Sequence, residues 1–121
     1  MKKSLQKLNN AYSLEELKDL LVDRSFNQKV LRQIEKDFAQ LRIEIDIHNM
    51  EVIQQIQEQV DLLLISDQQR LMNLLYRIDI NEKKIGELQM HDPTVPERDV
   101  ITFLIIQREL QKVIFRELYK Q

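Results

Sequence analysis

The feature that most constrains this chain is its shortage of turn-forming residues: it has one glycine and two prolines in 121 residues. Tight turns depend on such residues, because few others adopt the backbone angles that the turns require. Sheets and barrels need many tight turns, so the shortage favours long elements with few connections. The commonest residues include Leu, Gln, Glu, Lys and Ile, most of which tolerate or favour helix. We therefore expect an all-α fold, a bundle of four to six helices of unequal length.

Two stretches show a strong helical repeat of apolar residues, 27–65 and 95–119. The first predicts a long helix or a broken pair of helices, and the second predicts a long C-terminal helix. Inside the first, residues 41–47 alternate apolar and polar side chains, as a half-buried strand does. A single strand leaves its backbone unpaired, so we expect helix here. A strand that pairs across a dimer remains the alternative.

Helix ends are indicated by short local signals. Capping boxes, in which a hydroxyl and a carboxyl or amide satisfy backbone N–H groups, are predicted at Ser13 with Glu16, Ser66 with Gln69, and Thr94 with Glu97. Asp79 or Asn81 is expected to cap a short helix that Gly86 ends, and 91–96 reads as a loop. We expect residues 1–12 to form a weakly ordered arm and residues 13–121 to form a single helical domain.

Charge and composition exclude several classes of function. The net charge is −2 and there is no cysteine. The overall field therefore attracts neither nucleic acid nor an anionic membrane, and no disulfide framework is possible. The apolar runs 62–65 and 103–106 are too short to cross a bilayer. No apolar run follows Lys2 and Lys3, so we expect a cytoplasmic protein.

Chemical motifs are weak. Glu44 and His48 would share a helical face, but two carboxyl or imidazole ligands fall short of a metal site. His91 and Asp92 lie in the predicted loop without a nucleophile motif or a phosphate-binding glycine loop nearby. The sequence therefore predicts no metal, no cofactor, no small-molecule substrate and no catalytic residue.

The predicted last helix carries a basic ridge, with a cationic residue at every fourth position: Arg108, Lys112, Arg116 and Lys120. Such a ridge is able to meet phosphates or an acidic partner. Glu109 and Glu117 lie beside it, and basic residues are common near helix C-termini. We therefore favour a solvated face over a binding surface.

The same helix is apolar nearly all round, since only Thr102 is polar between Val100 and Ile106. It needs cover on several sides, either from its own bundle or from a second chain. Because residues 62–65 are also apolar all round, we favour a homodimer. The interface candidates are Ile101, Phe103, Ile105, Ile106, Leu62 and Leu64.

Two segments of the C-terminal half, 74–84 (LLYRIDINEKK) and 105–113 (IIQRELQKV), resemble small conserved helical proteins of unknown function from Bacteroidetes bacteria. That resemblance implies no activity and supplies no functional residues. We expect a non-enzymatic structural or interaction module that forms a homodimer or binds another helical protein. The alternatives are an adaptor of the inhibitor, antitoxin or immunity-protein type, and an enzyme with an unrecognised site in the bundle.

Overall fold

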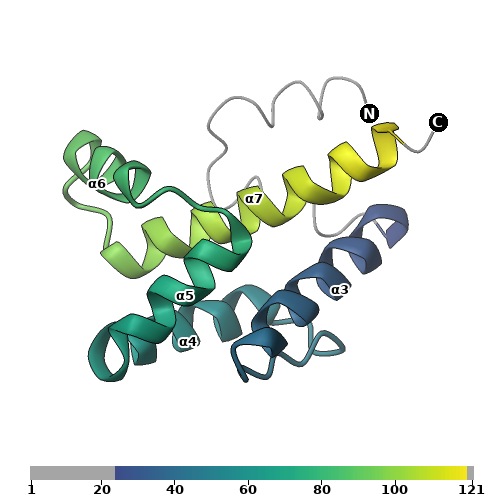
Figure 1. Ribbon diagram of the computed structural model, residues 1–121, viewed down its shortest axis with the longest axis horizontal. Coiled ribbons are helices and arrows are strands. Elements are labelled where there is room, and N and C mark those ends of the chain that lie inside the picture. Colours follow the sequence, from purple (N-terminus) through teal and green to yellow (C-terminus); the bar gives the residue numbers. More distant parts are fainter. Residues whose placement is uncertain (1–23, 120–121) are drawn as a thin grey trace.

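The structure, a computed structural model, describes residues 24–119, which form five α-helices and no strand (Figure 1). The helices are α3 (Arg24–Gln40), α4 (Val52–Ser66), α5 (Gln68–Ile78), α6 (Glu82–His91) and α7 (Glu97–Tyr119). The predicted all-α bundle with a long C-terminal helix is confirmed. The arm 1–12 and the capping box at Ser13 lie outside the described residues.

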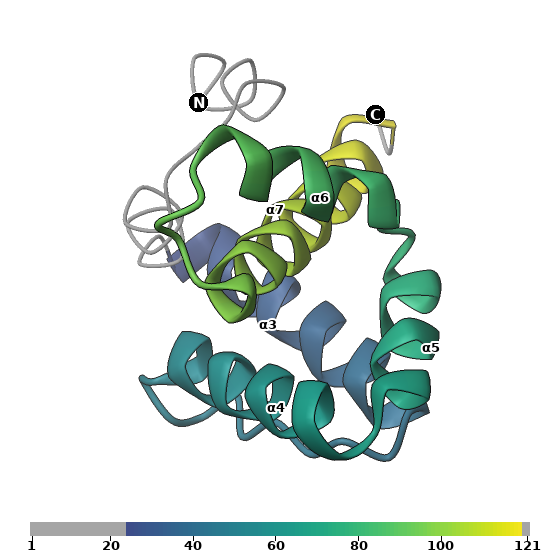
Figure 2. The same cartoon turned by 90° about the vertical axis from the view of Figure 1, so that its left-hand side faces the viewer.

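The long helix α7 lies at the centre of the described bundle. It packs against each of the other four helices, as Figure 2 shows from one end. Ile101, Ile105 and Ile106 are at most 1% exposed, and Phe103 packs against the core from a half-buried position. One chain therefore covers the helix face that we assigned to a second chain. The apolar surface of α7 therefore no longer supports the predicted homodimer, because α7 is the central helix of its own bundle.

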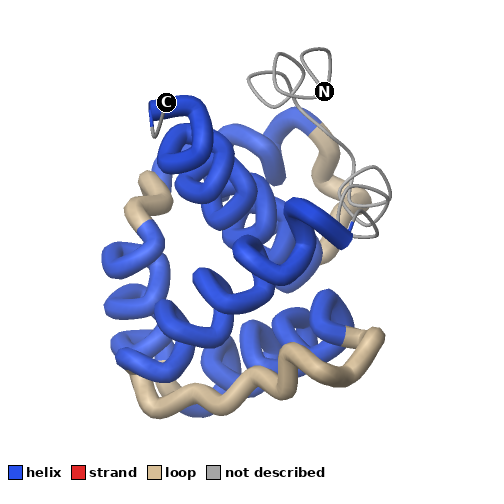
Figure 3. Tube along the Cα trace, turned by 90° about the vertical axis from the view of Figure 1, so that its right-hand side faces the viewer, coloured by secondary structure: helices blue, strands red, loops and turns tan. Residues whose placement is uncertain are grey.

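The repeat over 27–65 is a broken pair of helices, with residues 41–51 as the connection, drawn as a loop in Figure 3. The prediction of helix through 41–51 is wrong. The alternating pattern reflects a short extended segment, in which Ile43 and Ile45 are buried while Glu44 and Asp46 are exposed. Within the described residues this segment pairs with no strand.

The end of α3 shows why the helix stops where it does. The backbone N–H groups of Leu41 and Ile43 both donate to the carbonyl of Phe38, at 3.0 Å each, and Arg42 has a positive φ of 61°. Arg70, on α5, then donates from Nε to the carbonyl of Leu41 and from Nη2 to that of Arg42, both at 2.7 Å. These carbonyls lie at a helix end, where no later turn satisfies them. A residue of another helix therefore completes the terminus.

One of the predicted helix caps is confirmed, and others are wrong. Asn81 caps α6 as expected, accepting from the backbone N–H of Lys83. Ser66 belongs to α4 and donates to the carbonyl of Leu62, so Asp67 caps α5 in its place, accepting from the N–H of Arg70. Gly86 does not end α6, which continues to His91.

The loop before α7 is confirmed over 92–96, but its hydrogen bonds differ from those predicted. The Thr94 hydroxyl donates to the carboxylate of Asp92 at 2.6 Å instead of capping α7. The helix begins at Glu97, two residues later than the predicted start at 95.

Candidate functional site

Four charged side chains from three helices meet around two buried carboxyl groups, and we call them the buried charged cluster: Asp37, Arg77, Glu109 and Lys112. Asp37 on α3 and Glu109 on α7 are 2% and 0% exposed. Lys112 Nζ lies 3.0 Å from Asp37 Oδ2 and 3.2 Å from Glu109 Oε1. Arg77 Nε, on α5, lies 3.5 Å from Asp37 Oδ1. The cluster therefore ties α3, α5 and α7 together.

The two carboxyl groups of the cluster differ in protonation. Burial raises the pKa of Glu109 to about 8, and the neighbouring Asp37 carboxyl adds to this rise. Burial also pushes the pKa of Asp37 upward, but its contacts with Glu109, Gln33 and Lys112 outweigh that push and lower the pKa overall. At neutral pH the pair therefore holds a protonated Glu109 beside an ionised Asp37. Both Glu109 oxygens are buried, and Lys112 Nζ lies 3.2 Å from Oε1.

The predicted basic ridge faces the bundle. Arg108 Nη2 lies 3.1 Å from Asp79 Oδ2, and Arg116 Nη2 lies 2.5 Å from the Gln33 side-chain oxygen. With Lys112 in the cluster, three of the four ridge residues contact α3 or the end of α5. The expectation of a solvated face is wrong for Lys112, whose side chain is 20% exposed. Lys120 lies outside the described residues.

Sequence reasoning missed the acidic members of this cluster. Asp37 follows Ile34 by three residues and therefore lies on the buried face of α3. Glu109 holds the corresponding place between Ile105 and Val113 on α7. A carboxylate inside an apolar helical stripe is the signal that would have found both.

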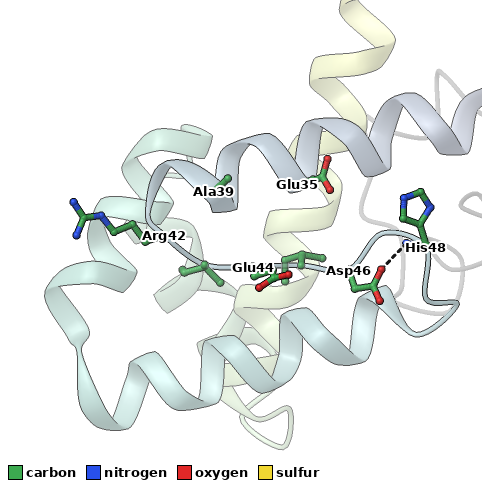
Figure 4. Close-up of a pocket in the computed structure, with 8 residues that line it drawn as sticks. Glu35, Ala39, Arg42, Glu44, Asp46 and His48 are labelled. Carbon is green, nitrogen blue, oxygen red and sulfur yellow. Dashed lines mark hydrogen bonds between the residues drawn. The ribbon is translucent and has the colours of Figure 1, made fainter.

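The second feature is an open groove between α3 and the segment 42–48, which we call the α3 groove (Figure 4). Its volume is about 570 Å³, and it is open to solvent. One wall is α3, with Glu35 and Ala39 exposed, and the other is the extended segment. Buried Ile43 and Ile45 alternate along that segment with exposed polar residues.

The extended segment is fixed from the side of α4. The Asp46 N–H donates to the side-chain oxygen of Gln55 at 2.8 Å, and the Gln55 amide returns a bond to the Asp46 carbonyl at 2.9 Å. At its other end, the Ile43 N–H donates to the carbonyl of Phe38 in the last turn of α3. Ile45 is 2% exposed, so its backbone as well as its side chain is shielded from solvent.

The groove is acidic. Glu35, Glu44 and Asp46 line it, together with one cationic residue, Arg42. None of these three carboxylates forms an ion pair with any described residue. Figure 4 shows Arg42 at one end, with the carboxylates toward the other.

The positions of Glu44 and His48 do not fit a shared metal site. Both belong to the non-helical connection, so they do not share a helical face. The His48 N–H donates to Asp46 Oδ1 at 3.0 Å. From Arg24 to Tyr119, no three His, Asp or Glu side chains gather as metal ligands would.

The two interface candidates on α4 differ in exposure. Leu62 is 56% exposed, whereas Leu64 is half-buried and packs against the core. Ile65, which we did not select, is 86% exposed.

None of the helices in the described range is long and apolar enough to cross a membrane.

Comparison of the chain with protein-family models, with curated proteins and with solved structures gives no match. The resemblance to Bacteroidetes proteins of unknown function therefore stays a prediction.

Proposed function

We propose that this chain is a non-enzymatic protein-binding module, and that the α3 groove receives a segment of another protein. One observation carries the proposal: two exposed carboxylates that line this groove, Glu35 and Glu44, form no ion pair with any described residue. Charged groups that their own chain does not neutralise are available to complementary charges on a partner.

The wall of the groove is organised before any partner arrives. Gln55 holds the backbone of Asp46 from α4, and Arg70 holds the carbonyls of Leu41 and Arg42 from α5. Binding to a preorganised wall avoids most of the entropy cost of ordering a loop. The groove therefore suits binding without a large rearrangement.

The buried charged cluster supports a structural role better than a catalytic one. Glu109 has the raised pKa of a general acid, and such shifts do gather at active sites. However, the side chain of Glu109 is 0% exposed. A general acid must come within hydrogen-bond distance of its substrate, and the groove is lined by other residues. We therefore place the module ahead of the enzyme, with the inhibitor-like adaptor as one form of the module.

The homodimer stays a prediction, but the surface that would form its interface is the exposed part of α4 instead of α7. Leu62 and Ile65, exposed on α4, are two apolar side chains where a stable interface uses roughly 20–30 residues a side. Light scattering after size exclusion, on wild type and on Leu62→Glu, tests it. A wild-type dimer that Leu62→Glu dissociates would support the homodimer, and a wild-type monomer would refute it.

The binding function is tested by selecting displayed random octapeptides on wild type, on Ala39→Arg and on Ile65→Ser. Ala39 is exposed on the α3 wall, so an arginine there would fill the groove without entering the core. We expect wild type and Ile65→Ser to enrich the same peptides and Ala39→Arg to lose them. No enrichment by wild type, or the same enrichment by Ala39→Arg, would overturn the proposal.

A further inference from the structure

We infer that α6 is a lid on the central helix: it detaches from α7 as one unit while α3, α4, α5 and α7 stay folded. A protein opens locally at elements that have few buried apolar contacts, at a lower free energy than global unfolding requires. The burial of α6, its polar contacts and its two connections all point to such an opening.

The helix α6 contributes no buried residue to the bundle. Each of the other four helices contributes at least three buried apolar side chains. On α6, Ile85 and Leu88 are only half-buried, and Met90 is 84% exposed. Gly86 lies in the middle of the helix with open space around it, and a glycine there weakens a helix. Little apolar burial therefore holds α6 in place.

Polar contacts do not compensate for this weak burial. Among the described residues, no side chain of α6 forms a hydrogen bond or an ion pair with another helix. The other helices are tied together by such contacts. Arg70 joins α5 to the end of α3, and Gln57 on α4 donates to Asp99 on α7 at 3.0 Å. Detaching α6 therefore breaks only apolar contacts between helices.

The face of α7 beneath α6 is separate from the main core. Val100 and Leu104 are 5% and 4% exposed, yet they do not belong to the apolar cluster that includes Ile106. Leu104 lies about 160° around the helix from Ile106, at about 100° per residue. The helix α6 packs against α7, over its N-terminal half (Figures 1 and 2). Opening the lid therefore uncovers Val100 and Leu104 and leaves the core closed.

Both connections of α6 allow this motion. Asp79, which ends α5 with a positive φ of 71°, is held against α7 by Arg108, whose Nη2 lies 3.1 Å from Asp79 Oδ2. The hinge therefore lies at Asn81, whose side chain caps α6 and moves with it. The second connection is the non-helical stretch 92–96. The ends of α5 and α7 thus keep their places when α6 detaches.

The chain has no cysteine, so one introduced thiol reports the exposure of a single position. Leu104→Cys and Ile106→Cys place the thiol on opposite faces of α7. The measurement is the rate of maleimide labelling of each folded variant, divided by its rate in concentrated urea. We expect Leu104→Cys to be labelled at least about 100-fold faster than Ile106→Cys, because the first requires only the lid to open. Equal rates would overturn the inference.

A second substitution in the core distinguishes lid opening from global unfolding. Ile34 on α3 is 0% exposed, and Ile34→Val should speed the labelling of Ile106→Cys by about two- to tenfold. The labelling of Leu104→Cys should not change, because α3 stays folded when the lid opens. The same acceleration in both would show that α6 opens only with the whole chain, and would overturn the inference.

A pair of neighbouring residues on α6 tests whether this helix is the cover. Leu88→Ala removes half-buried apolar surface and should speed the labelling of Leu104→Cys by about three- to tenfold. Glu87→Gln, at an exposed carboxylate on α6, is the matched control and should not change the rate. Equal rates in Leu88→Ala and Glu87→Gln would mean that α6 does not cover Leu104, and would overturn the inference.

Hydrogen exchange of the unsubstituted chain covers the case in which a cysteine variant does not fold. A detached helix of ten residues is marginal in water, so its amides exchange when the lid opens. We expect the amides of α6 to exchange at least about tenfold faster than those of α5, with a weaker dependence on urea, because opening exposes little surface. Equal protection and equal urea dependence in α5, α6 and α7 would overturn the inference.

Discussion

Asp37 and Glu35 are two residues apart on α3, and their surroundings are opposite. Asp37 points into the bundle, where Lys112 from α7 and Arg77 from α5 meet it. Glu35 lies on the exposed wall of the groove, where no described residue forms an ion pair with it. A carboxylate that its own chain neutralises helps to define the fold, because moving it would leave a buried charge alone. A carboxylate left unpaired at a groove remains available to a partner.

The first prediction concerns the inner side of α3. Lys112→Met keeps most of the apolar stem but removes the cation 3.0 Å from Asp37. Removing one partner of a buried ion pair costs about 3–5 kcal/mol, because the other charge stays buried. Gln33 and Arg77 still contact Asp37, so we expect a loss of about 3 kcal/mol in the free energy of unfolding. Urea denaturation measures it, and a loss under about 1 kcal/mol would contradict the internal role of this pair.

The second prediction concerns pH and Glu109. Its pKa is raised from 4.5 to about 8 in the folded chain, so the folded state holds a proton that the unfolded state releases above pH 4.5. The stabilisation is complete below that value and is lost as pH rises toward 8. We expect the free energy of unfolding to fall by up to about 1.4 kcal/mol per pH unit between pH 5 and 8.

Glu109→Gln provides the control, because an amide resembles the protonated acid and does not titrate. The variant should match wild type near pH 5 and exceed it in stability at pH 8. Asp37 does not interfere, since its pKa is lowered and it stays ionised throughout this range. An identical fall in wild type and variant would assign the pH dependence to other groups.

A smaller effect is expected for Arg77→Met. Arg77 Nε lies 3.5 Å from Asp37, and its side chain is 40% exposed, so water already solvates part of its charge. Partly exposed ion pairs contribute up to about 1 kcal/mol. Thermal unfolding followed by circular dichroism should place this variant between Lys112→Met and wild type. A loss equal to that of Lys112→Met would show that the two cations act as one unit.

The smallest effect belongs to the groove. Glu35→Gln and Glu44→Gln remove exposed charges without a described ion-pair partner, so each should change the free energy of unfolding by at most about 0.5 kcal/mol. Urea midpoints of the two variants and of Glu87→Gln should coincide with wild type. A destabilisation above about 1 kcal/mol would mean that these carboxylates maintain the fold, and the contrast with Asp37 would disappear.

The helices were predictable and the connection 41–51 was not, because two periodicities overlap there. Leu41, Ile45 and His48 fit a helical stripe, while Leu41, Ile43, Ile45 and Ile47 fit an alternation. Local sequence does not decide between them. The deciding contacts come from Arg70 and Gln55, which lie further along the chain.

The candidate sites divide in the same way. The residues of the basic ridge could be selected from the regular spacing of Arg108, Lys112 and Arg116, but the direction of their side chains could not. That direction depends on Asp37 and Asp79, acceptors on helices that sequence alone does not position. The groove was beyond prediction, since it exists only where α3 stops and the chain turns back.

The contacts of the Arg70 side chain determine when the groove is completed during synthesis. It bonds the carbonyls of Leu41 and Arg42 from 29 and 28 residues further along the chain. A nascent chain that has emerged only through α4 has the residues of the groove without the contact that ends α3. Because chains emerge N-terminus first, this contact forms only after α5 has left the ribosome and docked. A partner that recognises the groove would thereby distinguish a completed domain from an unfinished one.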